Sequence, residues 1–484
     1  MNYETVIGLE IHTQLKTATK IFCGCSNKFG GVPNTFTCPV CLGLPGALPV
    51  FNKAVLNLAL RVGISLGCEI SPFSKFDRKN YFYPDLPKNF QISQYDMPLC
   101  YKGHINLNVN KVPKTIRITR VHLEEDAGKL VHMSATGQIG EAQESLVDLN
   151  RTGVPLLEIV SEPDMNTPEE AYEYLIALKD ILKYIDVSDC NMEEGSLRCD
   201  ANISIRQVGE KKLGVKAEVK NLNSFKNVRD ALEYEAKRQI EVLNDGGKII
   251  QETRLWDDKK GITFSMRSKE EAQDYRYFPE PDLVSIVVTN EWLAEIKKEI
   301  PELPIARKNR FISSYGLPEY DAEVLTSSRD LANYYEECVK LHNDPKLVSN
   351  WIMVELLGLL KSKNMEITDC KVSPLHLSEL FNLIKEGTIS GKIAKTVFEE
   401  MFSSLKKPLD IVKEKGLVQI SDEKMILEVI DKVLLENTKS VDEYLAGKEK
   451  AIGYLVGQVM RHTSGKANPQ LVNKLLKEKL NTKK

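Results

Sequence analysis

The sequence predicts an α+β protein, in which a domain built on a mixed or antiparallel sheet precedes two all-helical domains. The first observation is length, because 484 residues exceed what one hydrophobic core accommodates. The second is pattern, since several stretches before residue 293 alternate apolar and polar residues as strands do, and this alternation largely stops afterwards. The third is composition: 42% hydrophobic and 27% charged residues with a net charge of −3 are typical of soluble globular proteins, and select neither nucleic acid nor membrane as a partner.

Proline-bearing segments mark the expected domain boundaries. One is the segment with Pro301 and Pro304, and the other is Lys406-Lys407-Pro408. We therefore expect domains over 1–293, 294–407 and 408–484. The N-terminus, MNYETVIGLE, lacks the basic and apolar regions of a signal peptide, and no stretch approaches about 18 apolar residues. We expect a cytoplasmic protein with no membrane segment.

The first expected strand covers residues 3–15, YETVIGLEIHTQL. Ile7, Leu9 and Ile11 alternate onto one face. Glu10 and His12 therefore share the opposite face. This pair is either an outward polar surface or part of a metal site, and the strand alone leaves both interpretations open.

The strongest local motif consists of two close cysteine pairs, Cys23-Gly-Cys25 and Cys38-Pro-Val-Cys41, joined by a loop rich in Gly, Pro and Asn. Four thiolates at this spacing suit a tetrahedral zinc ion and leave no open coordination position. We predict a structural zinc site in an insertion over 23–41, against the alternative of four free thiols. The remaining six of the ten cysteines are scattered and are interpreted as core or surface residues.

A helix is expected over 52–66, followed by FDRKNYFYPDLPKNFQISQYD, residues 76–96. In this segment Arg78, Lys79 and Lys88 are interleaved with aromatic residues and proline. Such a surface suits a phosphate or the end of a nucleotide. An aromatic loop packed on the core explains the pattern equally well.

Residues 116–129, IRITRVHLEEDAGK, run from an alternating strand into three consecutive acids, Glu124, Glu125 and Asp126. Because adjacent acids repel one another, a folded protein places them in a solvated turn or neutralises them with a cation. The turn is the better explanation of this stretch alone. A metal site becomes favoured because other expected strands also carry isolated carboxylates.

One of these is the apolar strand Val154–Val160, which is interrupted only by Glu158. Glu158 alternates onto the face opposite Leu157 and Ile159. A buried charge is costly unless it is paired, so Glu158 requires a partner, either an arginine such as Arg151 or a metal. A capping box at Thr167 then opens a helix that runs to about residue 185.

Residues 197–206, LRCDANISIR, alternate again and place Asp200 on a polar face, whereas the preceding Met192-Glu193-Glu194-Gly195 is predicted to be a turn. A helix is expected from about 223 to 244. Further helices are expected over 328–342, 347–362, 374–386, 390–403, 422–436, 440–446, 449–462 and 468–480.

The chemistry that these residues offer is narrow. The motifs GxxxxGK[ST], GxGxxG, GxSxG and HExxH are absent. What remains is an oxygen-dominated set with one imidazole, which suits magnesium and phosphoryl transfer: Glu10, His12, Glu125, Glu158 and Asp200. From the residues alone, a metal-dependent hydrolase or nuclease fits nearly as well, and a zinc-bearing RNA-binding or scaffold protein is a further alternative.

The whole chain also resembles the B subunit of the glutamyl/aspartyl-tRNA amidotransferases. The resemblance rests on VIGLEIH, FDRKNYFYPDLPK, QISQYD, HLEEDAGK, SLVDLNRTGVPLLEIVSEPD, MEEGSLRCDANIS, KNLNSF, DYRYFPEPDL and the tail GYLVGQVM with ANPQLVNKLLKEKL. It implies a cradle-shaped catalytic domain, a helical domain and a helical tail similar to the YqeY family. It also implies that Mg-ATP phosphorylates the side-chain carboxylate of a misacylated Glu-tRNA(Gln) or Asp-tRNA(Asn). Ammonia from a glutaminase partner, the A subunit, then displaces the phosphate, and a small C subunit makes the complex a heterotrimer.

The same resemblance assigns roles to residues. His12, Glu125 and Glu158 are implied as magnesium ligands, with Glu10 and Asp200 close by as catalytic groups. Lys79 and Lys88 are implied in the ammonia path and the phosphate site, with Arg78 beside them for ATP. The four cysteines are not a feature of every family member, so the zinc prediction rests on their spacing.

The tail carries the one strong charge asymmetry. Residues 451–484 hold seven Lys or Arg and one acid, Glu478, which gives +6 against −9 for residues 1–450. The usual explanation of such a run is a solvated helix face. We expect contact with the tRNA backbone instead, because this is the only strongly basic part of an acidic chain and the resemblance points the same way. The predicted contact residues are Arg461, Lys466, Lys474 and Lys477.

Overall fold

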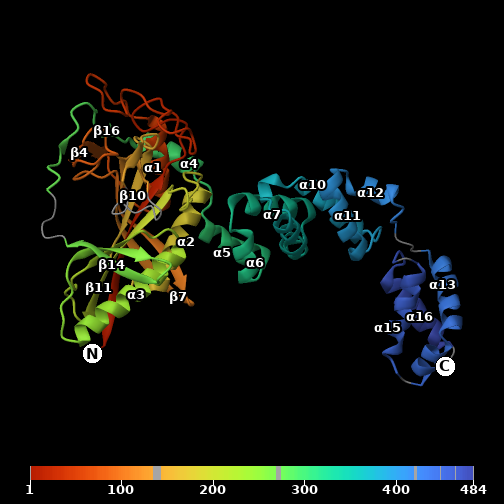
Figure 1. Ribbon diagram of the computed structural model, residues 1–484. Coiled ribbons are helices and arrows are strands. Elements are labelled where there is room, and N and C mark those ends of the chain that lie inside the picture. Colours follow the sequence, from red (N-terminus) through yellow and green to blue (C-terminus); the bar gives the residue numbers. More distant parts are fainter. Residues whose placement is uncertain are drawn as a thin grey trace. The chain divides into compact units, whose positions relative to one another are not determined.

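The computed structural model describes residues 2–133, 143–268, 274–418, 422–446, 448–463 and 465–482. Lys483 and Lys484, which contribute to the predicted charge of the tail, lie outside these residues. The chain forms two compact units, 1–304 and 305–484 (Figure 1). The first combines a sheet with helices and the second is helical in its described part, so the α+β prediction is confirmed.

The first unit is built on a 12-stranded sheet. Its main path runs β14 (Ile262–Ser268), β13 (Glu252–Asp257), β12 (Ala217–Lys220), β11 (Leu197–Gln207), β1 (Tyr3–Gln14), β10 (Pro155–Ser161), β7 (Val112–Glu125), β5 (Phe90–Ser93), β4 (Asp77–Asn80) and β15 (Phe278–Pro279). β6 (Cys100–Val109) pairs with β7 and with β2 (Glu69–Ile70). The pairs are antiparallel except β12 with β13, which makes the sheet mixed. Two small pairs accompany it: β3 (Phe73–Ser74) with β16 (Ile286–Val287), and β8 (Lys129–His132) with β9 (Ser145–Asp148).

The predicted alternation fixes which face of this sheet is the core. Ile7, Leu9 and Ile11 on β1 are at most 1% exposed and belong to one large apolar cluster. Figure 1 shows α2 and α3 side by side against the sheet, and both helices contribute buried residues to that cluster. Because neighbours along a strand point to opposite faces, Glu10 and His12 lie on the face without these helices. We call this second face the open face.

Polar side chains cap the first three helices of the first unit. The side chain of Asn52 caps α1 (Lys53–Ser65), and Ser224 caps α3 (Phe225–Asn244). At α2 (Pro168–Tyr184) the Thr167 side chain accepts a hydrogen bond from the Glu170 N–H. The Glu170 carboxylate reaches the N–H of Asn166 instead of closing the predicted capping box. The segment 192–195 is a turn, as predicted.

The second unit is helical throughout its described part. Its first hydrophobic cluster joins α5 (Pro304–Tyr315), α6 (Glu319–Leu325), α7 (Arg329–His342), α8 (Pro345–Trp351), α9 (Leu357–Ser362), α10 (Pro374–Lys385), α11 (Gly391–Ser404) and α12 (Pro408–Glu414). A π-helical turn over Ile352–Leu356 connects α8 to α9, so the expected helix over 347–362 is continuous but irregular. A separate cluster joins α13 (Glu423–Glu436), α14 (Thr438–Leu445), α15 (Ala451–His462) and α16 (Pro469–Asn481).

Four described helices were not expected from the sequence: α4 (Asn290–Glu299), α5, α6 and α12. The sequence predicts domain boundaries at Pro304 and Pro408, yet these prolines are the first residues of α5 and α12. Proline suits that position because the N–H it lacks has no helical partner there. Ile411 and Val412 of α12 pack in the cluster of residues 311–412, whereas the next cluster begins at Ile426. Among the described residues, no helix combines the length and apolarity needed to cross a membrane.

Candidate active site and metal centres

Three adjacent strands place a row of ionisable side chains on the open face. In the antiparallel register His12 of β1 pairs with Glu158 of β10, and Glu158 pairs with His122 of β7. Paired residues point to the same side of a sheet. Glu10 lies two residues before His12, and Glu124 lies two residues after His122, so both join the same face. We call these five residues the carboxylate cluster.

The atoms of the carboxylate cluster converge closely. His12 Nε2 lies 3.7 Å from Glu10 Oε1, 3.6 Å from Glu124 Oε1 and 3.4 Å from Glu158 Oε2. These separations are longer than a good N–H···O hydrogen bond. They lie within the range of about 3.0–4.2 Å that separates two ligands of one ion with bonds of about 2.1 Å. The donor set of carboxylates with imidazole therefore fits a divalent cation such as Mg²⁺.

The electrostatics of the cluster also favour a cation. Burial opposes a charged imidazole at His12, but the nearby carboxylates of Glu158, Glu124 and Glu10 outweigh it and raise the pKa of His12 to about 9. Burial and the charge of Glu158 raise the pKa of Glu10. Although burial opposes it, the imidazoles of His122 and His12 hold the pKa of Glu158 well below its usual range. Positive charge is thus stabilised here at neutral pH, whether a proton or a metal supplies it.

Charged residues border the cluster. Arg120 Nη2 lies 3.6 Å from Glu158 Oε1. Beyond Glu10, Asp200 of β11 forms an ion pair with Lys220 of β12, and Lys220 also lies 3.2 Å from Glu218. Burial lowers the pKa of Lys220, but the charges of Asp200 and Glu218 outweigh it and raise that pKa. Asp200 is therefore near the cluster but already paired.

The three consecutive acids, two at the end of β7 and Asp126 after it, lie in three different environments. Glu124 joins the carboxylate cluster. Glu125 faces the other way, where its Oε1 accepts hydrogen bonds from Lys88 Nζ and from the Ile92 N–H. Asp126 is buried, and accepts from Gln14 at 2.9 Å and from Arg198 at 3.0 Å. One residue of displacement along a strand is enough to exchange the two faces.

The three predicted magnesium ligands, His12, Glu125 and Glu158, therefore do not all lie on one face of the sheet. His12 and Glu158 meet with Glu10, whereas Glu125 lies on the opposite face, and Glu124 lies near His12 in its place. Arg151 is not the partner of Glu158, as it donates to the backbone carbonyls of Ala127 and Gly128.

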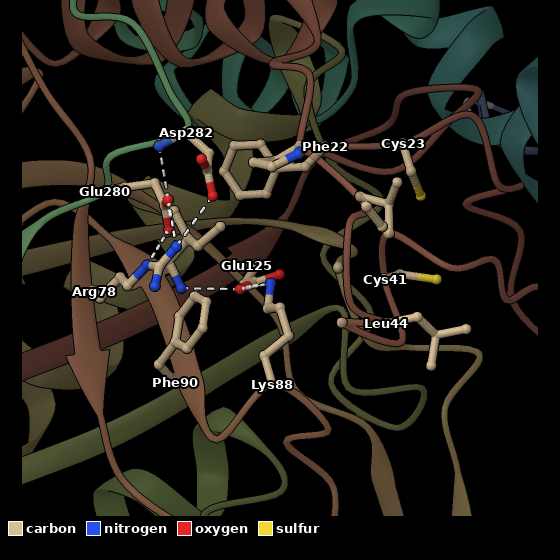
Figure 2. A pocket seen from close by; sticks show the side chains of 16 residues that line it. Phe22, Cys23, Cys41, Leu44, Arg78, Lys88, Phe90, Glu125, Glu280 and Asp282 are labelled. Carbon is tan, nitrogen blue, oxygen red and sulfur yellow. Dashed lines mark hydrogen bonds and ion pairs between the residues drawn. The ribbon is translucent and has the colours of Figure 1, made fainter.

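Glu125 belongs to a cavity of about 190 Å³ at the end of the core-side face (Figure 2). Figure 2 shows Lys88 directed at Glu125, and Arg78 directed at Glu280 and Asp282. Arg78 Nε and Nη2 donate to the two Glu280 oxygens at 2.7 and 2.9 Å, and Nη2 contacts Asp282 at 3.2 Å. Each acid named here has a cation beside it, Lys88 at Glu125 and Arg78 at Glu280 and Asp282.

Lys79 is separated from Arg78 and Lys88. It pairs with Gln91 across β4 and β5, on the same side as Ser93, which pairs with Glu124. Its Nζ lies 4.9 Å from the centre of the Tyr275 ring. The neighbouring Phe82 and Tyr83 are 81% and 53% exposed, so these two rings are not packed on the core, whereas Leu86 of the same loop is buried. The predicted phosphate surface is thus distributed over both faces of the sheet.

The four predicted zinc ligands do meet. One sulfur from each of Cys23, Cys25, Cys38 and Cys41 lies within 4.8 Å of the others. The Sγ atoms of Cys38 and Cys41 are 3.9 Å apart, close to the edge of about 3.8 Å expected for a tetrahedron with zinc–sulfur bonds of about 2.3 Å. Lys20 Nζ lies 3.8 Å from Cys41 Sγ. Cys23 and Cys41 also line the cavity that contains Glu125.

Comparison with known proteins identifies the family. A model described as the GatB/GatE catalytic domain matches residues 5–294, and one described as the GatB domain matches residues 333–480. The chain belongs to the amidotransferase B-subunit family. Relatives named as the B subunit of aspartyl/glutamyl-tRNA(Asn/Gln) amidotransferase include proteins of Carboxydothermus hydrogenoformans, 60% identical over 99% of both chains, and of Thermoanaerobacter sp., 60% identical over 99% of this chain and all of the relative. That of Moorella thermoacetica is 58% identical over 99% of this chain and all of the relative.

Two members of the carboxylate cluster, His122 and Glu124, were not predicted from the sequence. A signal was present, because Arg120, His122 and Glu124 are spaced two apart within IRITRVHLEED, the same spacing that singles out Glu10 and His12. The run of three acids obscured it. Which acid faces which way depends on the register between β7 and β10, and a single strand does not contain that information.

The predicted tRNA-contact residues lie on α15, on α16 and in the segment between them. Arg461, Lys474 and Lys477 are exposed and Lys466 is half-buried. In the described part of the chain Lys474 lies 4.0 Å from Glu478, too far for more than a weak exposed pair. Their charges are therefore available to a polyanion.

Proposed function

We propose that the chain catalyses ATP-dependent amidation of misacylated tRNA, with phosphoryl transfer at the carboxylate cluster on the open face. The observation that carries this proposal is the convergence of Glu10, Glu124 and Glu158 around two imidazoles with Arg120 as the adjoining cation. Family membership supports the reaction, since the relatives are named for aspartyl/glutamyl-tRNA(Asn/Gln) amidotransferase.

The reaction has two balanced steps. First, a carboxylate oxygen of the tRNA-linked glutamate or aspartate bonds to the γ-phosphorus of ATP, the bond from that phosphorus to the β–γ bridging oxygen breaks, and ADP leaves. Second, ammonia bonds to the acyl carbon, the bond from that carbon to the phosphate oxygen breaks, and phosphate leaves with the excess proton passing to solvent. The first step is needed because a carboxylate is a poor acyl electrophile and phosphate is a good leaving group.

Mg²⁺ would be held by His12, Glu158, Glu10 and Glu124, and when bound it would neutralise charge on the phosphate oxygens. The residues of the chain supply the remainder of the site. Lys79 lies on the open face and would attract the nucleotide phosphates. A cavity of about 290 Å³ begins at Glu10 and continues along Gly8, Val160 and Asn202, which leaves room on this face for part of a nucleotide.

The opposite face suits a different role. Because Lys88 and Arg78 are each paired with acids, we do not assign them to ATP. Lys88 and Glu125 remain candidates for the ammonia path that the family resemblance implies. The sequence offers no Ser or Cys nucleophile set for glutamine hydrolysis, so we propose that a glutaminase partner, the A subunit, supplies ammonia. We also propose that a small C subunit makes the complex a heterotrimer.

Two further parts of the proposal concern the cysteines and the tail. We propose that Cys23, Cys25, Cys38 and Cys41 bind one structural zinc ion, because four sulfurs at tetrahedral spacing leave no ligand position for substrate. We propose that Arg461, Lys466, Lys474 and Lys477 contact tRNA phosphates, which contributes affinity without sequence recognition.

The test is ATP cleavage by the purified complex with misacylated tRNA, ATP, Mg²⁺ and free ammonium. We expect cleavage to depend on Glu-tRNA(Gln) or Asp-tRNA(Asn), and amidated tRNA to form in equal amount. ATP cleavage that ignores the charged tRNA would overturn the proposal in favour of a hydrolase. Glutamine-dependent product from the rigorously isolated chain would refute the need for a glutaminase partner.

A further inference from the structure

A buried lysine lies beside the four-cysteine site. Lys20 precedes Cys23 by three residues and is 0% exposed, and no other lysine is buried in the described part of the chain. Lysines ordinarily keep their ammonium group in water. An ammonium group that is fully buried loses its hydration, which is strongly unfavourable unless an opposite charge lies close to it. The position of Lys20 therefore requires a negatively charged partner.

A carboxylate does not supply that charge. Glu125 lies near the stem of Lys20, since a Cβ on Gly153 would be 3.7 Å from Lys20 Cδ and 3.9 Å from Glu125 Oε2. The Glu125 carboxylate, however, is paired with Lys88. Lys20 Nζ donates instead to the Phe36 carbonyl at 2.7 Å, and a carbonyl offers a dipole but no net charge.

The negative partner is sulfur. Lys20 Nζ lies 3.8 Å from Cys41 Sγ, and the Cys38 N–H donates to the same sulfur at 3.1 Å. Four thiolates around one Zn²⁺ carry a net negative charge, because their summed charge exceeds that of the ion. Four neutral thiols would carry no charge at all. A buried ammonium group at this place therefore fits metal-bound thiolates better than free thiols.

Burial explains why Cys41 is the sulfur that needs this contact. Cys41 is 4% exposed, whereas Cys23, Cys25 and Cys38 are only partly buried. Water can donate hydrogen bonds to a thiolate near the surface, but it has little access to Cys41. Lys20 and the Cys38 N–H take the place of those water molecules. The buried ammonium group thus lies against the one ligand of the four that is itself buried.

Lys20 also connects the two cysteine pairs. Its backbone N–H donates to the Cys25 carbonyl at 3.0 Å, in the first pair. Its side chain reaches the Phe36 carbonyl and Cys41 Sγ, just before and within the second pair. Residues 26–37 separate the two pairs along the chain. A residue that contacts both pairs helps to fix the distance between their sulfurs.

We propose that Lys20 is a positioning residue of the zinc site, which offsets the negative charge of the thiolates through Cys41 and so strengthens zinc binding. The inference rests on the proposed zinc ion but not on the reaction at the carboxylate cluster. Partners of metal ligands typically contribute about 10–100-fold to metal affinity. We therefore expect Lys20→Met, which keeps most of the aliphatic stem and removes the charge, to bind zinc about 10–100-fold more weakly.

The experiment uses the full chain co-purified with its partner subunits, and measures zinc affinity by competition with a chelator. Lys20→Arg keeps a positive charge and should recover part of the affinity that Lys20→Met loses. Lys28→Met is the matched control, because Lys28 is an exposed lysine of the same insertion and its loss should leave zinc affinity unchanged. If Lys20→Met does not fold, Lys20→Gln, whose amide can still donate a hydrogen bond, takes its place.

A spectroscopic measurement separates charge from packing. Co²⁺ bound in place of zinc absorbs light by electron transfer from sulfur to metal. Removal of a nearby positive charge makes sulfur a better electron donor and moves this absorption to longer wavelength. Lys20→Met should show the shift, whereas Ile21→Val, which removes a buried methylene from the adjacent residue without a change of charge, should not.

Unchanged zinc affinity together with an unshifted Co²⁺ absorption in Lys20→Met would overturn the role of Lys20. A wild-type complex that binds no zinc would overturn the proposed zinc site as well. ATP-dependent amidation by the same wild-type complex tests the proposed reaction independently of both results.

Discussion

The two faces of the N-terminal sheet place neighbouring glutamates in opposite chemical environments. Glu124 lies among Glu158 and two histidines, with more negative than positive charge nearby. Glu125, the next residue, accepts from Lys88 and a backbone N–H, so its charge is balanced within the protein. A balanced charge contributes to the fold, whereas an unbalanced buried charge requires a ligand. In this protein, an acid that has a cationic partner within the chain is structural, and an acid without one is a candidate ligand.

The largest expected effect is the loss of zinc and of thermal stability when one of the four clustered cysteines, on the side of the sheet that carries Glu125, is replaced. Cys38→Ser should remove the whole equivalent of zinc, because the serine hydroxyl is a poor replacement for a thiolate ligand. We expect a clearly lowered melting temperature while binding of Mn²⁺, used as a probe for Mg²⁺, persists on the open face. Metal analysis and thermal unfolding of the same samples provide the measurement. Full stability in a metal-free protein would show that the four thiols are free.

The direct comparison is Glu124→Gln against Glu125→Gln. Loss of a cation ligand should weaken Mn²⁺ binding to Glu124→Gln by about 10–100-fold. Glu125→Gln should leave Mn²⁺ affinity unchanged, but it leaves Lys88 buried without its acid, which should lower the free energy of unfolding by about 3–5 kcal/mol. Titration of Mn²⁺ and denaturant unfolding measure the two effects. Equal losses of Mn²⁺ affinity would mean that both acids face one metal.

Much of this fold follows from local sequence. The cap at Thr167 and the alternation of β1 and β11 were predictable because each depends on residues within a few positions. The meeting of the four cysteines was predictable for the same reason. Which of Glu124 and Glu125 lies on the open face was not predictable, because it depends on pairing with a strand some thirty residues away. The helix starts at Pro304 and Pro408 were not predictable either, because proline is common both in linkers and at the first position of helices.

A third prediction concerns the basic side chains of the tail, which are expected to pair with tRNA phosphates. Changing Arg461, Lys466, Lys474 and Lys477 together to Gln should weaken tRNA binding by about tenfold or more and reduce the salt dependence by about one unit of slope for each lost phosphate contact. The control changes the exposed Lys424 and Lys432 of α13. Binding measured over a series of salt concentrations distinguishes the outcomes. An unchanged slope would mean that the four charges form only a solvated surface.

The smallest expected effect concerns a paired acid of the second unit. Glu336 contacts Arg307 at 2.9 Å and Arg310 at 2.7 Å. Although burial opposes it, these hydrogen bonds lower the pKa of Glu336, so its contribution is present above the unfolded-state pKa and is lost as pH falls through the lower folded-state value. Glu336→Gln should cost about 1–2 kcal/mol at neutral pH, and less in acid.

Denaturant unfolding at neutral pH and at about pH 3 measures this difference. The control is Glu400→Gln, whose acid pairs with Lys415 at the surface and should have no resolvable effect. A cost for Glu336→Gln that stays constant with pH would contradict the assigned role of its charge.

The central claim is that phosphoryl transfer takes place on the open face at Glu158. The most direct measurement follows labelled γ-phosphate from ATP to misacylated tRNA, without ammonia, in the wild-type complex and in Glu158→Gln. We expect transfer to fall by at least about 100-fold at saturating Mg²⁺, because a carboxylate proposed to hold that ion is lost. Zinc content and tRNA affinity should remain at the wild-type level. Transfer at a near-normal rate by a folded Glu158→Gln complex would contradict the claim.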